Sequence, residues 1–317
     1  MLKSDDGQEA DDLYEGLARR PCNFERWETA DLAPSRFQAE GFAARPLILP
    51  LPKDGWPAVG RWNANYLTRV AGDGVVRPLV EGGTAGWRSE GLEMTLSEYI
   101  SNEMAVAATR LLPDAELDGA DQNATYVFMQ TGFDESDGLG ALREDIAAPT
   151  FLHEALNETD LYLMLGGRST GLSFHDHSAS WLAMVAGTKF WMVFPPKAFG
   201  RVESEMRKLG LLPLRDDLGR GEGTARWLWR MLARGDDAAS GFIAEGFECL
   251  QQPGTVVFLP PGWWHAVINL ETFTAAVGGQ PSRPDPHAEQ AATPGAGLWR
   301  YKTFRSAAEG SGRRSEL

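Results

Sequence analysis

Residues 171–194 read GLSFHDHSASWLAMVAGTKFWMVF, and this stretch decides the fold class. Short apolar runs alternate in it with glycine, serine and threonine, a pattern that is typical of β-strands separated by tight turns. Similar runs lie on both sides of it, in TYVFMQTGF at 125–133, LYLMLGG at 161–167, GTVVFLPP at 254–261 and WWHAVINL at 263–270. Many short strands without helices between them predict an antiparallel sandwich or barrel.

The composition is that of a globular protein. Of 317 residues, 43% are hydrophobic and 23% are charged, which argues against disorder, collagen and coiled coil. Thirty Lys and Arg against 44 Asp and Glu give a net charge of -14, so phosphate backbones would be repelled and a nucleic-acid partner is not expected. No apolar run reaches the roughly 20 residues of a membrane-spanning helix, and the acidic start MLKSDDGQEADDLYEG is unlike a signal peptide.

Changes in composition divide the chain into four parts. Residues 1–19 are acidic and have no apolar period, so they are predicted to form a flexible arm. Residues 20–122 mix helix and strand patterns, and residues 123–280 form the strand-rich core. The amphipathic segment RWLWRMLAR predicts a helical insert over 197–245 of this core. Residues 281–317 are rich in Pro, Gly, Ala and Arg and are predicted to be a C-terminal extension.

The part before the core contains two helix patterns and a strand pattern. In WNANYLTRV at 62–70, apolar residues recur at helical spacing. Thr95 and Glu98 form a capping box that predicts the start of a second helix, and apolar residues continue at helical spacing as far as Leu111. ARPLILPL at 44–51 is predicted to contain a short strand.

Only five histidines are present, and three of them indicate a metal site. On a strand, residues i and i+2 face the same side, so His175 and His177 are predicted to lie side by side while Asp176 points away. His265 lies on a later strand, where it shares a face with Asn269. Neutral imidazole binds iron, zinc, copper and nickel, so three converging rings would hold one ion with positions open for catalysis. The alternative interpretation is that each ring only has hydrogen-bond partners in a half-buried sheet.

Cys22 and Cys249 are the only two cysteines. They are too few for a disulfide scaffold, and their spacing makes no zinc motif. Spacing alone therefore allows either one disulfide or two thiols.

The order of these segments resembles the jumonji-C (JmjC) branch of the cupin-like oxygenases. The order is a glycine-rich turn, the HxH motif, GTKFW at 187–191, a Phe-Pro-Pro turn and PGTVVFLPPGWWH at 253–265. TLSEYI at 95–100 and NATYVF at 123–128 add to the resemblance, which covers roughly residues 20–280. It implies a mainly β fold, a double-stranded β-helix or jelly roll, with an α/β N-terminal elaboration and a helical insert.

The resemblance also implies a ligand set. Family members bind Fe(II) through an HxD or HxE motif and a distal histidine, and they bind 2-oxoglutarate through a lysine. By position, His175, His177 and His265 would hold the metal. Lys189, which follows a predicted hairpin turn at Gly187, would hold the remote carboxylate of 2-oxoglutarate.

Three positions depart from the family pattern. Leu172 stands where members often have a threonine and Gly279 where they often have an asparagine, so Ser173 or Tyr162 would substitute as a contact to 2-oxoglutarate. His177 replaces a carboxylate, and a neutral ligand leaves more positive charge on the ion. This change favours zinc, nickel or copper relative to iron.

The HxH motif is similar to that of a family branch in the lumen of the endoplasmic reticulum. Members of that branch resemble this chain at Cys22 and Cys249, which implies a disulfide between them and a luminal location. The missing signal-peptide pattern points instead to the cytoplasm. Both compartments therefore stay open.

The resemblance implies two alternative functions. The first is an Fe(II)- and 2-oxoglutarate-dependent dioxygenase that hydroxylates a side chain of a protein substrate. The second is a non-catalytic relative that keeps the barrel and binds a metal or a protein partner. Lys189 and His265 favour the enzyme, whereas Leu172, Gly279 and the HxH motif favour the binding protein.

Overall fold

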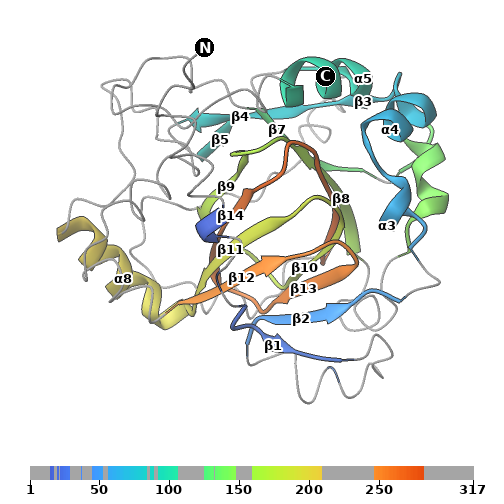
Figure 1. Cartoon of the computed structure of the whole chain (residues 1–317). Helices are drawn as coiled ribbons and strands as arrows, with labels where there is room; N and C mark the ends of the chain where they lie inside the picture. The colour runs from blue at the N-terminus through green and yellow to red at the C-terminus, as the bar shows by residue number, and fades with distance from the viewer. Residues whose placement is uncertain are drawn as a thin grey trace, which may run out of the picture.

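The predicted run of short strands forms two β-sheets that face each other (Figure 1). The structure is a computed structural model, and it describes residues 15–17, 20, 22–28, 37, 45–52, 56–83, 86–88, 92–105, 125–131, 133–147, 159–208 and 246–281. Most of the predicted acidic arm, residues 209–245 of the predicted insert and the predicted extension from 282 onward lie outside the described residues.

The larger sheet forms one wall of the barrel and has the order β1-β2-β13-β10-β15-β8-β7-β4-β5. All its neighbouring strands are antiparallel except β1 and β2. Its strands are β1 (Glu25–Arg26), β2 (Leu47–Pro50), β4 (Pro78–Gly83), β5 (Gly86–Arg88), β7 (Thr125–Gln130), β8 (Thr159–Gly166), β10 (Ser180–Ala186), β13 (Thr255–Leu259) and β15 (Thr274–Pro281).

The smaller sheet forms the opposite wall, in the order β12-β11-β14-β9. Its strands are β9 (Gly171–His175), β11 (Lys189–Phe194), β12 (Phe247–Gln251) and β14 (Trp264–Asn269), all antiparallel to their neighbours. From β8 to β15 the chain passes back and forth between the two sheets, which is the winding of a double-stranded β-helix. The predicted mainly β fold is therefore confirmed.

The connection at Gly187 differs from the prediction. A hairpin was expected there, but β10 belongs to the larger sheet and β11 to the smaller one, so the connection crosses between the sheets. Gly187 has φ 71°, and a Cβ atom there would overlap with the backbone of Phe273, so the crossing requires glycine. The crossing places Lys189 at the first position of β11, beside β14.

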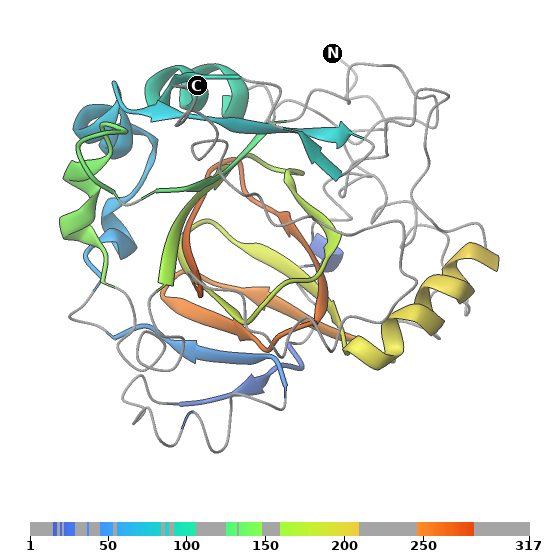
Figure 2. The same ribbon diagram turned by 180° about the vertical axis from the view of Figure 1, so that it is seen from behind.

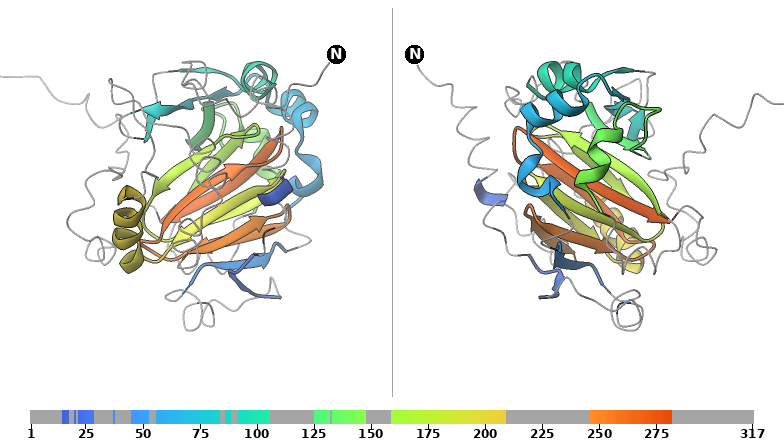
Figure 3. Two further views of the ribbon diagram at one scale, coloured as in Figure 1. Left: turned by 60° about the vertical axis from the view of Figure 1, so that its left-hand side comes forward. Right: turned by 90° about the vertical axis from the view of Figure 1, so that its right-hand side faces the viewer.

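Two layers of apolar side chains hold the fold together. The first lies between the sheets, and its members include Met164, Leu182, Trp191, Val267 and Ala276. The second lies on the outer face of the larger sheet, where the helices α3 (Ala58–Arg61), α4 (Ala64–Ala71), α5 (Leu96–Glu98) and η2 (Tyr99–Met104) cover it (Figure 3). The central strands of the larger sheet, such as β10 and β13, are thus buried on both faces, which explains their nearly continuous apolar sequences.

The helix predicted over 62–70 is present as α4, and the predicted start of the second helix is confirmed, but the second helix changes type. Asn63 caps α4 by accepting a hydrogen bond from Tyr66 N at 2.9 Å, and Thr95 and Glu98 form the predicted capping box. After three residues, α5 passes into the π-helix η2 instead of continuing as an α-helix. The Ser101 hydroxyl donates to the carbonyl of Ser97 at 2.7 Å and thereby competes for the acceptor of an α-helical bond.

The remaining elements lie at the edges of the barrel. They are the ladder of β3 (Val75–Val76) and β6 (Met94–Thr95), the 3-10 helix η4 (Gly140–Asp145) and the helix α8 (Pro196–Lys208). α8 opens the predicted helical insert. Within the described part of the chain, no helix is long and apolar enough to cross a membrane.

A disulfide joins Cys22 to Cys249 across 227 positions of sequence. Next to it, Asn23 N donates to the carbonyl of Glu248 at 2.9 Å, and Arg20 forms an ion pair with the Glu248 carboxylate at 2.6 Å. These contacts fix the N-terminal segment to β12 of the smaller sheet, while β1 pairs with β2 of the larger one. The segment therefore connects the two sheets along one edge of the barrel (Figure 2).

Candidate metal centre and its pocket

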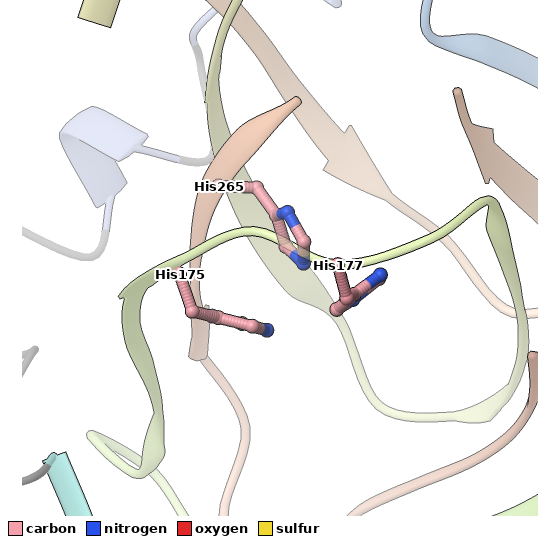
Figure 4. A group of neighbouring side chains, drawn as sticks. All are labelled: His175, His177 and His265. Carbon is pink, nitrogen blue, oxygen red and sulfur yellow. The ribbon is translucent and has the colours of Figure 1, made fainter. Parts of the chain in front are cut away.

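Three histidines meet between the two sheets (Figure 4). His175 is the last residue of β9, and His265 lies directly opposite it in the β9–β14 ladder. Their ring centroids are 4.1 Å apart. A shift in the register next to His265 marks a β-bulge, a feature that redirects side chains near functional sites.

His177 reaches the cluster by a different route from the predicted one. β9 ends at His175, so His177 lies in the connection to β10, and strand alternation does not account for its direction. Its ring centroid is nevertheless 5.3 Å from that of His175 and 4.8 Å from that of His265. Ligand atoms of the three residues lie within 4.8 Å of one another, and Asp176 does not belong to this group.

Hydrogen bonds determine which ring nitrogen faces the cluster. Nδ1 of His177 donates to the carbonyl of Ser178 at 2.6 Å, and Nδ1 of His265 donates to that of Trp263 at 2.9 Å. A carbonyl only accepts, so Nδ1 carries the proton and Nε2 has a free lone pair. Burial lowers the pKa of both rings, and the neighbouring histidines lower that of His265 further, so both stay neutral.

This donor set fits a divalent transition metal. Two nitrogens bound at about 2.1 Å to one ion lie about 3 to 4 Å apart, so small side-chain rotations would close the cluster around an ion. Neutral imidazoles with free Nε2 atoms are the ligand form that iron, zinc, copper and nickel accept. The three histidines would hold such an ion through one ring nitrogen each.

A cavity of about 30 Å³ adjoins the histidines. This volume holds about two water molecules. The cavity is lined by Tyr126, Phe128, Tyr162, Met164, Leu172, His175, His177, Ser180, Trp181, Leu182, Trp191, His265, Val267, Gly279 and Gln280. Its walls are mostly apolar, and none of these residues carries a carboxylate.

Lys189 is buried in the same interior. It is 1% exposed, and its Nζ donates to Asn269 Oδ1 at 2.7 Å and to Tyr126 Oη at 3.1 Å. Both partners are neutral, and no ion pair joins Lys189 to a described carboxylate. Burial therefore lowers the pKa of Lys189 to about 7. Lys189 does not itself line the cavity, but Tyr126 does.

Of the two residues predicted to contact 2-oxoglutarate in place of the missing threonine and asparagine, only Tyr162 has a described side chain. Tyr162 lines the cavity, and burial raises its pKa to about 12. Ser173 lies in β9, but its side chain is outside the described part of the structure. Leu172 lines the cavity as an apolar wall opposite Val267 in the β9–β14 ladder.

Gly279 has a packing reason to be glycine. It lies opposite Trp181 in the β10–β15 ladder, and a Cβ atom at this position would overlap with the Trp181 indole. We expect Gly279→Asn to lower the free energy of unfolding by about 1–3 kcal/mol, without improving the binding of 2-oxoglutarate. Urea denaturation measures the first effect. Gly200→Asn is the control, because nothing lies within 4 Å of a Cβ atom there. A Gly279→Asn protein of unchanged stability would contradict this account.

Sequence patterns missed several residues of the site. Tyr126 and Asn269, which bind Lys189, were not assigned roles, although Asn269 was placed on the face of His265. Trp191 lines the cavity, and its ring centroid is 5.9 Å from that of His265. Strand alternation from Lys189 through Trp191 would have placed both side chains on one face.

Comparisons with known proteins agree with this architecture. The family model "Cupin-like domain" matches residues 34–278. The chain is 27% identical to an arginine-specific demethylase, JMJ22, of Arabidopsis thaliana, over 75% of this chain and 42% of that protein. It is 28% identical to a bifunctional arginine demethylase and lysyl-hydroxylase, psr-1, of Caenorhabditis elegans, over 73% of this chain and 54% of that protein. It thus spans about half the length of these two relatives.

A relative of similar size also matches. Human JmjC domain-containing protein 8 is 25% identical over 79% of this chain and 81% of its own length. The family match covers most of the chain and includes every strand of the smaller sheet with its three clustered histidines. The chain therefore belongs to the cupin-like domain family, in its JmjC branch.

Proposed function

We propose that this protein is an Fe(II)- and 2-oxoglutarate-dependent oxygenase that hydroxylates a side chain of a protein substrate. One observation carries the proposal: three imidazoles with converging ligand atoms and a buried lysine without a described counter-charge face the same barrel interior. The relatives named as demethylases or hydroxylases support the reaction class.

The spacing along β14 suits a ligand held at both ends. His265 and Asn269 are four residues apart on this strand, which is about 13 Å, and Lys189 lies opposite Asn269. His265 lines the cavity at one end of this span, and at the other end Lys189 is bonded to Asn269 and to the cavity-lining Tyr126. A five-carbon dicarboxylate would then contact the metal at one end and Lys189 at the other.

When bound, iron and 2-oxoglutarate would supply the oxidising power. In the overall reaction one atom of O2 enters a substrate C–H bond as a hydroxyl, and the other enters succinate as 2-oxoglutarate loses CO2. The chain's residues contribute binding and exclusion of water. The three histidines hold the ion, Lys189 neutralises a carboxylate, and apolar walls such as Leu172 keep bulk water out.

Binding of 2-oxoglutarate should be coupled to the protonation of Lys189. The free lysine has a pKa of about 7, so at pH 8 it is mostly neutral, and a carboxylate beside Nζ raises its pKa again. We expect uptake of up to about one proton per ligand at pH 8. Calorimetry in buffers of different ionisation enthalpy measures this uptake.

The variant Lys189→Met tests the effect of the ammonium charge alone, because methionine keeps much of the apolar part of the lysine side chain. We expect it to weaken 2-oxoglutarate binding about tenfold or more and to remove the proton uptake. Lys197→Met is the matched control, since Lys197 is exposed on α8. If Lys189→Met binds 2-oxoglutarate as the parent protein does, Lys189 is not the carboxylate contact.

A second candidate function is a metal- or partner-binding protein without catalysis. The cavity of about 30 Å³ favours it, because a five-carbon dicarboxylate needs more room than two water molecules. The apolar Leu172 and the neutral His177 favour it as well. Tight zinc binding with no binding of 2-oxoglutarate to any metal-loaded form would support this function.

A further inference from the structure

A buried glutamine connects the two walls of the barrel. Gln251 is the last residue of β12, in the smaller sheet, and its side chain is fully buried. Its Nε2 donates to the backbone carbonyls of Leu182 at 2.8 Å and Thr255 at 3.1 Å, which lie on β10 and β13 of the larger sheet. The amide nitrogen therefore has an acceptor for each of its two hydrogens on the opposite wall.

The oxygen of the same amide holds the Trp191 indole. Nε1 of Trp191 donates to Gln251 Oε1 at 2.8 Å in the buried interior. In the β11–β12 ladder Gln251 pairs with Lys189 and Trp191 pairs with Cys249, so this bond runs diagonally between the two strands. A flipped amide would place a donor against the indole N–H and an acceptor against two carbonyls. Only one orientation of the amide therefore satisfies all three hydrogen bonds.

The indole in turn lies beside one of the clustered histidines. The ring centroids of Trp191 and His265 are 5.9 Å apart, and the two ring planes form an angle of 32°. Nδ1 of His265 is bonded to the Trp263 carbonyl, which leaves Nε2 as the ligand atom. One hydrogen bond limits the position of Nδ1 but still permits the ring to tilt. A fixed indole beside the imidazole restricts this tilt and so the direction of the Nε2 lone pair.

The third bond of the Gln251 amide goes beyond what connecting the sheets requires. The two bonds from Nε2 are sufficient to join the walls. The bond from Oε1 reaches a residue that lines the cavity beside the histidines. Because all three bonds depend on one orientation of the amide, the larger sheet also determines where the indole lies. A continuous series of contacts thus runs from the larger sheet through Gln251 and Trp191 to His265.

We propose that Gln251 is a positioning residue of the metal centre and acts through the Trp191 indole on the orientation of the His265 ring. This inference rests on the three-histidine metal site of the proposed function, but it does not depend on 2-oxoglutarate. Loss of a group that bonds directly to a metal ligand typically lowers metal affinity by about 10–100-fold. Gln251 acts through one intervening ring, so we expect its loss to lower the affinity by about fivefold or more.

Binding of Co²⁺ separates this role from a purely structural one, because the visible absorption spectrum of Co²⁺ depends on the geometry of its ligands. The full chain and the variants Gln251→Met and Trp191→Phe are titrated with Co²⁺, and their spectra are compared at saturation. Methionine removes the three hydrogen bonds of the amide, and phenylalanine removes the indole N–H but keeps an aromatic ring. We expect each variant to bind Co²⁺ about fivefold or more weakly and to have a changed spectrum at saturation.

A double variant shows whether the two residues act through their shared hydrogen bond. If they do, Gln251→Met adds little once Trp191→Phe has removed that bond, and the double variant binds Co²⁺ within about twofold of the weaker single variant. Trp62→Phe is the matched control, because Trp62 is also buried and its Nε1 donates to Asp145 Oδ2 at 3.1 Å, in the layer outside the barrel. It should lower stability and leave the Co²⁺ affinity and spectrum unchanged.

The outcomes separate this inference from the oxygenase proposal. The affinity and spectrum of the parent protein in Trp191→Phe, or additive losses in the double variant, would overturn the inference, and the first of these results decides even if Gln251→Met does not fold. The expected changes in the variants, with no binding of 2-oxoglutarate to the Fe(II)-loaded parent protein, would leave the positioning role standing and reject the oxygenase function. A parent protein that binds neither Co²⁺ nor Zn²⁺ would reject both.

Discussion

Replacing His265 by alanine should lower the affinity of the protein for a divalent metal by about 100-fold or more. Loss of groups that only orient a metal ligand already costs 10–100-fold, and His265 would contribute one of three direct bonds. The ring is buried, and the bond from Nδ1 to the Trp263 carbonyl holds it in place, so His265 would be a pre-oriented ligand. Competition with a chelator, using Co²⁺ and Zn²⁺, measures the change.

His287→Ala is the control for this variant, because it removes a histidine from the predicted C-terminal extension. It should bind metal as the parent protein does. A cooperative thermal transition without metal should show that both variants are folded, with His265→Ala the less stable of the two because it removes a buried ring. Equal metal affinity in the His265→Ala and parent proteins would mean that the three rings do not form a metal centre.

Replacing Cys22 by serine should lower the free energy of unfolding by up to about 5 kcal/mol. The bond closes a loop of 227 residues, and in the chain-entropy model a longer loop gives a larger loss of unfolded-state freedom. The variant would also release the N-terminal segment that connects the sheets, although the ion pair of Arg20 with Glu248 would remain. For a protein of this size the loss corresponds to a lower Tm, by up to about 10 °C.

Reduction of the disulfide in the parent protein is an internal control for the Cys22→Ser variant. The parent protein in reductant should unfold near the temperature of the Cys22→Ser variant, and the variant itself should not respond to reductant. Equal transitions with and without the bond would contradict a stabilising role. We propose on the same grounds that the protein matures in an oxidising compartment, where such a bond persists.

Local signals predicted the elements that depend on local chemistry. The predicted capping box at Thr95 lies within three residues of the helix it starts, so the sequence contains the whole interaction. The helix α4 was predicted from the helical spacing of its apolar residues, and its cap at Asn63, which was not predicted, is equally local. The short strands from Thr125 onward follow from alternating or continuous apolar runs bounded by turns. The change to π-helical geometry after Glu98, where the Ser101 hydroxyl donates to the Ser97 carbonyl, is not recorded by any apolar pattern.

Long-range pairing was harder to predict. A glycine turn at Gly187 suits a hairpin and a crossing between sheets equally well, and only the partners of β10 and β11 distinguish them. The end of β9 at His175 also depends on long-range pairing. Strand alternation predicted correctly that His177 lies beside His175, but the strand that it assumed ends before His177.

The partners of Lys189 lie far from it in sequence. Tyr126 is 63 positions away and Asn269 is 80 positions away, so only the fold brings them together. Gly279 is similar, because its need to be glycine depends on Trp181 in the neighbouring strand. The family resemblance identified Lys189 as a candidate contact. Only the structure shows that the partners of its ammonium group are neutral and do not compensate its charge.

An anaerobic calorimetric titration of 2-oxoglutarate into the full chain, with and without Fe(II), tests the central claim most directly. The account predicts binding that requires the metal, followed on exposure to oxygen by succinate formation. The metal-free protein should bind the ligand at least about tenfold more weakly, because Lys189 alone would hold it. Absence of 2-oxoglutarate binding to the Fe(II)-loaded chain, together with absence of succinate in air, would contradict the account.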